Sequence, residues 1–453
     1  MTVVIAHFLI FTIVIFSNGQ IIKNIFISKN FKINNLEVFF VGIVATGFVA
    51  QLISLFFSLS DLILYINLIF TLFILSKFKG IQFRILHIFY AVLFIICISN
   101  IYGSGFSDDI NHYHASLIQN YDNSKLIVGI NNLHNHFGYN SMWLYLHSYL
   151  NFNKYFLQDI HVLNSIIFFG ILVYLLTEII TDENNFKTKV LAIFLILFFL
   201  FKYTRLKEFG LDRPGVIIFC FINYFSFKYF KSINELKDKK ILNTILVLFC
   251  LFLTSIKIFF IFSFIIPLTF LFSDYLKYKK LLIFYTFPVI FLFIYCLKNA
   301  LISGCIIYPF SFTCIEILPW NSKIVASELL INTEAAAKGF PNYIGKFQLQ
   351  EYIKNFNWID TWVSKFLEEF LNYLYTILFS LILTVLSLKI NNFKREFNFN
   401  NMHKVLAFLI LALNIFIFLK SPVTRYHHIF FISIGTYLIY FLILITYLKK
   451  KHF

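Results

Sequence analysis

Long apolar runs separated by short polar segments follow one another along almost the whole chain. A helix needs about 20 apolar residues to cross the hydrocarbon core of a bilayer, with a range of about 17–25. The candidate spans on this criterion are residues 2–17, 36–58, 61–77, 85–101, 160–180, 189–203, 213–229, 241–255, 257–273, 281–298, 364–388, 404–420 and 427–447. The pattern predicts an all-α fold, a polytopic transmembrane bundle of about 13 spans that forms a single integral membrane domain over residues 1–453.

Lys257 divides the longest of these apolar stretches. The run from Ile241 to Phe272 is too long for one span, so we expect two short helices that meet at this lysine. One long tilted helix is the alternative. An ionisable residue with apolar sequence on both sides is a functional hypothesis by default.

The basic residues give the bundle an orientation. Alternate short segments between the spans, counted from the one after the first span, hold most of the 38 Lys and Arg residues. Short cytoplasmic segments of membrane proteins carry an excess of Lys and Arg. We therefore expect the N-terminus outside and the C-terminus in the cytoplasm.

Two segments are much longer than the turns between the other helices, residues 102–160 and 299–363. Both fall on the extracytoplasmic side in this orientation, and loops of this length are often functional. The first is rich in His, Asn, Tyr and Trp. Its parts 110–119 and 141–149 have the pattern of amphipathic helices that lie in the membrane interface.

Composition supports a membrane protein and argues against nucleic-acid binding. Of the 453 residues, 59% are hydrophobic and 13% are charged, whereas an ordinary soluble domain has about 45–50% apolar and about 25% charged residues. The net charge of +16 comes from Lys and Arg clusters between apolar runs, which is the membrane pattern. Among the six cysteines, Cys305 and Cys314 lie in the second long segment, where an extracytoplasmic location permits a disulfide.

The densest polar cluster opens the first long segment, directly after a span. It consists of Ser107-Asp108-Asp109-Ile110-Asn111-His112-Tyr113-His114. Adjacent carboxylates and imidazoles suit proton abstraction, with Asp or His as general base, and they also suit a divalent cation. The same residues fit a helix start, because Ser107 is a good N-cap and acidic side chains favour the positive end of the helix dipole. Both interpretations can hold, since a capped helix end is a rigid support for a catalytic Asp.

This cluster is the first half of a longer signature. It continues after about 20 residues, and the whole reads Asp109-x-x-x-Tyr113-His114 and then Asn132-Leu133-His134-x-x-x-Gly138-x-Asn140-Ser141-x-Trp143. The signature resembles that of a family of uncharacterised bacterial polytopic membrane proteins, which usually has Arg at the position of His136. Later landmarks of that family have counterparts in Lys207-Glu208-Phe209-Gly210-x-Asp212, Ser303-Gly304-x-x-x-Tyr308-Pro309 with Trp320, and Ser421-Pro422-x-x-Arg425-Tyr426. The family's layout resembles the GT-C class of glycosyltransferases, which take sugars from polyprenyl-phosphate donors outside the cytoplasm.

The resemblance implies a GT-C-like enzyme of the bacterial inner membrane. Such an enzyme would transfer a sugar from a polyprenyl-phosphate-linked donor to a glycan or lipid acceptor during cell-surface glycan assembly. Asp109, or Asp108, would be the general base. Cations that hold the donor phosphate would be Arg205, Lys207, Arg213, Lys257 and Arg425. The sugar site would be formed by Tyr113, His114, His134, Asn140 and Trp143. No cofactor and no set of metal ligands is expected.

Two other functions stay open. An O-antigen polymerase or ligase type enzyme also has about a dozen spans and large outer loops, but the Asp/His/Asn-rich block here lies in the early segment. A lipid-linked glycan transporter or flippase is expected to carry charges near the middle of its spans and paired repeats. No repeat is visible, and nearly all charges lie at span ends.

Overall fold

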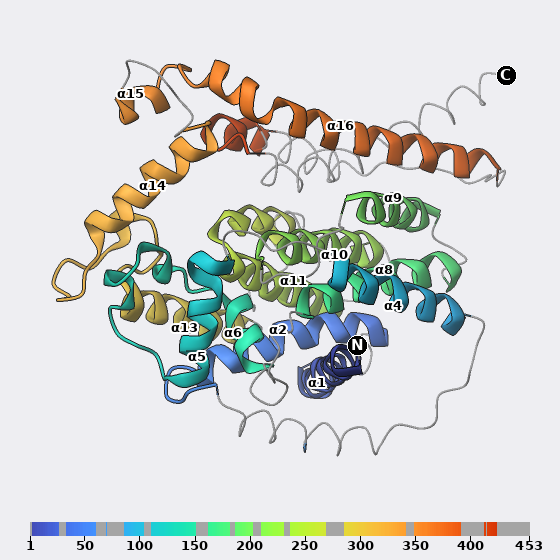
Figure 1. Ribbon diagram of the computed structural model, residues 1–453. Coiled ribbons are helices and arrows are strands. Elements are labelled where there is room, and N and C mark those ends of the chain that lie inside the picture. Colours follow the sequence, from blue (N-terminus) through green and yellow to red (C-terminus); the bar gives the residue numbers. More distant parts are fainter. Residues whose placement is uncertain are drawn as a thin grey trace.

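A computed structural model shows an all-α protein, in agreement with the sequence (Figure 1). It describes residues 2–26, 33–59, 69, 86–103, 110–150, 162–181, 186–202, 210–230, 236–268, 285–340, 348–390, 412–413 and 415–423. Within these ranges the only β-type pairing is an isolated bridge between Cys305 and Cys314.

Several helices are long and apolar enough to cross a membrane, so the chain is a multi-pass membrane protein. Within the described residues there are six of these, and they are α1 (Thr2–Phe26), α2 (Asn35–Ile53), α8 (Leu163–Thr181), α11 (Leu236–Ile256), α13 (Thr286–Ser303) and α16 (Ile359–Ile390). Three further helices match predicted spans, and they are α4 (Leu86–Gly103), α9 (Phe186–Lys202) and α10 (Asp212–Phe230). The total of about 13 stays a prediction, because most of 61–77 and 404–420 and all of 427–447 lie outside the described residues.

Lys257 marks a helix end, as its place in the apolar run predicts. Helix α11 stops at Ile256, and the 3-10 helix η4 (Ile258–Phe264) begins directly after the lysine. Lys257 itself is extended, with φ −154° and ψ 128°. The alternative of one long helix through this position is therefore wrong.

Helices α1 and α2 approach each other closely at two glycines. Figure 1 views α1 almost along its axis while α2 runs across the page, so the two helices cross. A Cβ added to Gly42 would lie 1.9 Å from the carbonyl oxygen of Ile15, and one added to Gly19 would lie 2.1 Å from that of Val38. Small residues allow such close backbone packing between membrane helices.

The helix α6 (Met142–Tyr149) differs from the expected interfacial helix. All eight of its residues are buried, and it packs against α2, α11 and α5 (Ala115–Asn123). Segment 141–149 combines apolar and polar side chains, which gave it an amphipathic pattern, but the side chains of Trp143 and Ser148 find hydrogen-bond partners inside the protein. Ser148 Oγ, for example, donates a hydrogen bond to Asp122 Oδ1 at 2.6 Å.

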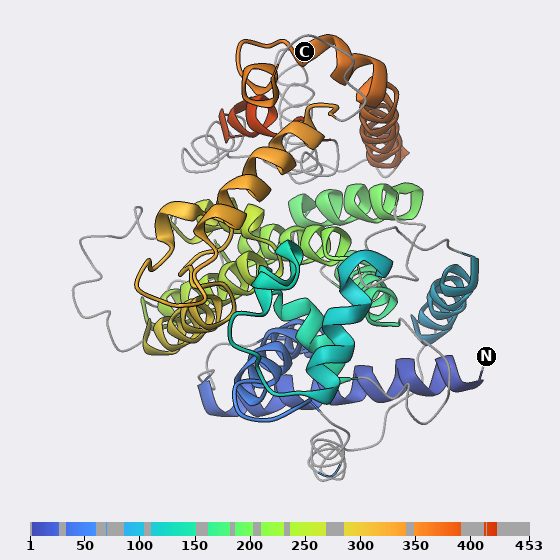
Figure 2. The same cartoon turned by 60° about the vertical axis from the view of Figure 1, so that its left-hand side comes forward.

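The second long segment leads from the bundle to α16. Helix α14 (Lys323–Ala337) rises from the loops that follow α13 towards the short helix α15 (Leu349–Ile353) and the start of α16 (Figures 1 and 2). Helix α16 then runs beside α9, where the rings of Phe201 and Phe379 lie 5.2 Å apart.

Candidate functional site

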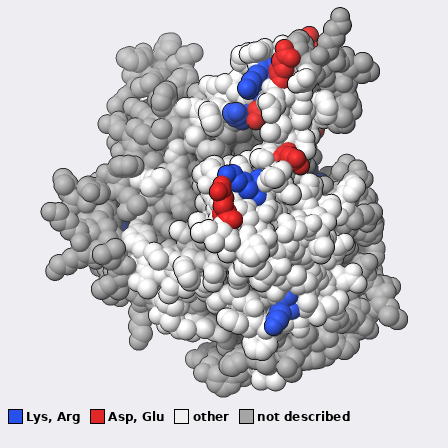
Figure 3. Space-filling view, turned by 90° about the vertical axis from the view of Figure 1, so that its left-hand side faces the viewer, with Lys and Arg blue, Asp and Glu red and all other residues white. Residues whose placement is uncertain are grey.

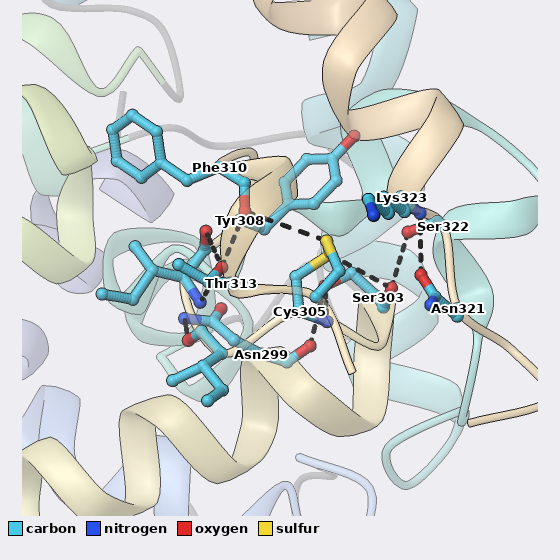
Figure 4. Close-up of a disulfide and its surroundings, with 12 residues drawn as sticks. Asn299, Ser303, Cys305, Tyr308, Phe310, Thr313, Asn321, Ser322 and Lys323 are labelled. Carbon is cyan, nitrogen blue, oxygen red and sulfur yellow. Dashed lines mark hydrogen bonds between the residues drawn. A yellow bond between two sulfur atoms is a disulfide. The ribbon is translucent and has the colours of Figure 1, made fainter. Parts of the chain in front are cut away.

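The described parts of the two long segments, here called the first loop (102–160) and the second loop (299–363), are joined by hydrogen bonds. Asn131 Nδ2 donates a hydrogen bond to Ser322 Oγ at 2.6 Å, and Ser322 Oγ donates to the carbonyl oxygen of Ser303 at 2.6 Å. Tyr308 OH donates to the carbonyl oxygen of Asn135 at 2.7 Å. Figure 4 shows Ser303, Tyr308 and Ser322 on the second-loop side of this contact. Because partners 173 and 191 positions apart are joined, each loop holds the other in place.

A disulfide between Cys305 and Cys314 closes part of the second loop (Figure 4). The disulfide that the sequence permitted is therefore present. It follows directly on Gly304, which ends α13 with φ +74°. A Cβ at Gly304 would lie 2.7 Å from Cα of Asn321, so both the backbone angle and the space favour glycine.

Four side chains of the first loop gather into what we call the histidine–tyrosine cluster, namely Tyr113, His134, His136 and Tyr139. Tyr113 belongs to a short π-helix, η1 (Ile110–His114), and its ring stacks on His136 with centroids 5.0 Å apart. The His136 ring lies 5.2 Å from His134 and 5.8 Å from Tyr139. The two halves of the signature, separated by about 20 residues, thus meet in space. Single π-helical turns are frequent at functional sites.

The cluster continues into the second loop through Tyr308. The ring of Tyr139 lies 5.7 Å from that of Tyr308, and burial raises the pKa of Tyr308. His134 lies on the exposed side of the cluster. Its Nδ1 accepts a hydrogen bond from the backbone N–H of His136 at 3.3 Å, so the neutral ring carries its proton on Nε2. A ligand above the cluster would therefore meet an imidazole N–H beside aromatic rings.

Gly210, from the second landmark motif, and Ile256, next to Lys257, are both hydrogen-bonded to the first-loop signature, Gly210 through Asn164. Trp143 Nε1 donates to Asn164 Oδ1 at 3.1 Å, and Asn164 Nδ2 donates to the carbonyl oxygen of Gly210 at 3.3 Å. Ser141 Oγ donates to the carbonyl oxygen of Ile256, the residue before Lys257, at 3.0 Å. The segments around Gly210 and Lys257 are thus tied to the signature by hydrogen bonds.

The predicted sugar-site residues fall into two groups. His134 is exposed, and Tyr113, although largely buried, forms part of the cluster. Trp143 has no exposed surface, and Asn140 and His114 are buried as well. Asn140 Nδ2 donates to the carbonyl oxygen of Tyr295 on α13 at 3.3 Å. Trp143 and Asn140 are thus both buried and hydrogen-bonded inside the protein.

Of the five cations predicted to hold the donor phosphate, Lys257 and Arg213 lie within the described residues. Lys257 Nζ lies 2.6 Å from Asp212 Oδ1, and both side chains are partly exposed. Arg213 is half-buried on the first turn of α10. The remaining predicted site residues lie outside the described residues, and they are Asp108, Asp109, Arg205, Lys207 and Arg425.

Lys298 is the last residue of the predicted span 281–298 and is not among the predicted site residues. It is completely buried on α13, with its Nζ 3.5 Å from the centroid of the Tyr145 ring. Nζ donates to Ser54 Oγ at 2.5 Å and to the carbonyl oxygen of Gln51 at 3.2 Å. No carboxylate of the described residues pairs with it, so the aromatic face and these oxygens replace an ion pair. The lysine ties α13 to the end of α2 and to α6 beneath the first loop.

Among the described residues, no group of three or more His, Cys, Asp or Glu side chains could hold a metal ion. The histidines of the cluster are arranged as stacked and tilted rings.

The family model described as "Domain of unknown function (DUF8201)" matches residues 1–432. The chain therefore belongs to this family. No curated protein matches the chain. No solved structure matches it either.

Proposed function

We propose that this member of the DUF8201 family is a membrane glycosyltransferase that uses a polyprenyl-phosphate-linked sugar donor on the extracytoplasmic side. The observation that carries the proposal is the stacking of Tyr113 on His136. It joins the segment that directly follows Asp109 in the chain to the segment that holds His134. Imidazole and aromatic side chains from both halves of the signature then meet in one place.

Asp109 is the general base of the proposed reaction. Its carboxylate takes the proton of the acceptor hydroxyl, and the hydroxyl oxygen bonds to the anomeric carbon of the donor sugar. The bond from that carbon to the phosphate oxygen breaks, and the polyprenyl phosphate leaves with the electron pair. One base is sufficient for this displacement, which inverts the anomeric configuration. Tyr113 and His134 contact the sugar, and Lys257 with Arg205, Arg213 and Arg425 stabilises the phosphate.

The described geometry supports the roles of Lys257 and His134. Lys257 follows the carbonyl to which Ser141 donates, so its backbone is held next to the signature. The ion pair with Asp212 limits the motion of the Lys257 side chain. Both side chains remain partly exposed, so the ammonium is still accessible to a phosphate. His134 presents its Nε2–H from a loop that is held by the second loop.

The test compares lipid-linked saccharides in a deletion strain complemented with wild-type chain, Asp109→Asn or the exposed control Glu316→Gln. We expect mass spectrometry of lipid extracts to show one accumulated intermediate in the deletion strain and with Asp109→Asn, and none with the other two. Asn keeps the shape of Asp but cannot take a proton. Normal glycan assembly with Asp109→Asn at wild-type expression would show that Asp109 is not the base.

The same strains separate transfer from transport. A missing transferase leaves its lipid-linked donor on the outer leaflet, where an impermeant glycosidase or periodate reaches it in spheroplasts. A missing flippase leaves the lipid-linked glycan on the inner leaflet, where the reagent reaches it only after lysis. An O-antigen polymerase or ligase type enzyme would instead leave a complete repeat unit or polymer on the lipid.

A further inference from the structure

A cavity with charged side chains in its wall lies away from the histidine–tyrosine cluster. It has a volume of about 420 Å³ and is formed by α14, α15, the turn before α16 and the end of the helix at 415–420. None of its lining residues belongs to the cluster. The side chains that give it its chemistry are Glu334, Lys338, Lys354, Phe356, Trp358 and Lys420.

Cationic groups are in excess in this cavity. Glu334 accepts from Lys338 Nζ at 2.6 Å and lies 3.7 Å from Lys420 Nζ, so one carboxylate serves two lysines. Lys354 is exposed at the rim, and its ammonium pairs with no carboxylate of the described residues. Three ammonium groups against one carboxylate leave two positive charges for an anionic ligand.

Lys338 is fixed in the floor of the cavity. It is almost fully buried, and its Nζ also donates to the carbonyl oxygen of Ile353 at 2.9 Å. The ammonium lies 5.3 Å from the Trp358 ring. Since an ammonium has three donors and two are used here, one N–H is left for a ligand. A buried lysine held in this way is a preformed anion contact.

The turn beside the cavity adopts a costly backbone conformation. Asn355 and Phe356 both have positive φ, at 56° and 59°. A bulky residue rarely adopts this conformation, and such strain is concentrated at functional sites. The turn leaves the Phe356 ring 58% exposed at the rim, next to Lys354.

The cavity lies where two apolar helices end. Helix α16 begins at Ile359, directly after the turn, and the helix at 415–420 ends at Lys420. Ile359, Val363 and Leu419 expose apolar surface at these ends. Helices α14, α15 and α16 lie in the upper part of Figure 3, where many of the charged side chains of this face gather. Lysines and aromatic rings at the end of apolar helices suit the level of lipid headgroups.

We propose that this cavity binds the phosphate of an anionic bilayer phospholipid, with Lys338, Lys354 and Lys420 around the phosphate and Phe356 against the upper part of the acyl chains. The lipid holds the second loop and the start of α16 at the membrane surface. This proposal does not depend on the transferase activity.

The test measures binding of phosphatidylglycerol and of zwitterionic phosphatidylcholine to the purified full-length protein by native mass spectrometry. The variants are Lys354→Gln with Lys420→Gln, and the control is Lys365→Gln, an exposed lysine of α16 that does not line the cavity. We expect wild type to prefer phosphatidylglycerol. Each cavity lysine is worth about fivefold in affinity, so the double variant should bind it about 20–30-fold more weakly. The control should bind as wild type does.

Unchanged melting temperatures in phosphatidylcholine would show that the variants are folded. Equal binding of phosphatidylglycerol by wild type and the double variant would overturn the proposal. Displacement of the lipid by inorganic phosphate at similar concentration would also overturn it, because the cavity would then be a site for free phosphate.

Discussion

Glu37 and Lys228 are 191 positions apart in the sequence, yet Lys228 Nζ lies 2.8 Å from Glu37 Oε1 inside the bundle. Glu178 Oε1 lies 2.8 Å from the same ammonium. Tyr174 and Tyr229 donate hydrogen bonds to the two oxygens of Glu37 at 3.0 and 2.7 Å. The network joins the start of α2 to the ends of α8 and α10. The orientation expected from the basic residues places all three of these helix ends on the cytoplasmic side.

Lys228→Met should destabilise the protein strongly. It leaves the buried carboxylates of Glu37 and Glu178 side by side without their cation, and removing one partner of a buried ion pair costs about 3–5 kcal/mol. The control is Lys323→Met, because Lys323 and Glu316 form an exposed pair and such pairs contribute about 0–1 kcal/mol. Thermal unfolding of the detergent-solubilised proteins measures both. Equal losses in the two variants would show that the buried network is not a stabilising feature.

Gly42→Ala should separate α1 from α2. The new methyl group would meet the backbone oxygen of Ile15, which cannot move without its helix, and overpacking of this kind costs about 1–3 kcal/mol. Gly47→Ala, on the same helix, meets the side chains of Phe252 and Met142 instead, which can shift. We expect the first variant to lose clearly more stability than the second in the same thermal assay. The reverse order would contradict the close crossing at Gly42.

The disulfide between Cys305 and Cys314 predicts how many cysteines can be alkylated with and without a reductant. In the oxidised protein, denatured and alkylated without reductant, four cysteines should be modified, namely Cys97, Cys220, Cys250 and Cys296. All six should be modified after reduction. Mass spectrometry of the alkylated chain distinguishes the two counts. Six modified cysteines without reductant would mean that the second loop is not bridged and would remove one argument for its extracytoplasmic location.

The burial of Tyr308 predicts that the protein loses stability at alkaline pH. Burial raises the pKa of Tyr308 above that of a tyrosine in the unfolded chain. The neutral Tyr308 hydroxyl therefore contributes fully to the stability of the fold below about pH 10, the usual tyrosine pKa, and this contribution falls as the pH rises further. Tyr308→Phe lacks the hydrogen bond to Asn135 and should be about 1 kcal/mol less stable at neutral pH. The difference from wild type should shrink above about pH 10. A constant difference across this range would contradict the burial of the hydroxyl.

Helix positions were largely predictable from the sequence, whereas their partners were not. Apolar length and the break at Lys257 predicted α2, α10 and α11 to within five residues at each end. The amphipathic pattern of segment 141–149 did not predict that α6 is buried, with Trp143 and Ser148 bonded to residues of other helices. Pattern along the chain cannot show such partners.

The candidate site was predictable as a set of motifs but not as an arrangement. Nothing in the sequence links Trp143 to Gly210, because the link passes through Asn164, a polar residue in the first turn of an apolar helix. The signature also did not show that Trp143 is completely buried. The fourth landmark motif lies elsewhere, where the carbonyl oxygen of Pro422 accepts from Trp362 Nε1 at 2.7 Å.

The proposed transfer reaction depends on both long loops lying on the extracytoplasmic side. Single cysteines at Lys125 in the first loop, Glu328 on α14 and Asn24 at the opposite end of the bundle test this in a Cys296→Ala background. All three positions are exposed. With an impermeant maleimide on intact spheroplasts, we expect Lys125→Cys and Glu328→Cys to be labelled, and Asn24→Cys to be labelled only after lysis. Labelling of Asn24→Cys alone in intact spheroplasts would contradict the orientation and with it the location of the proposed site.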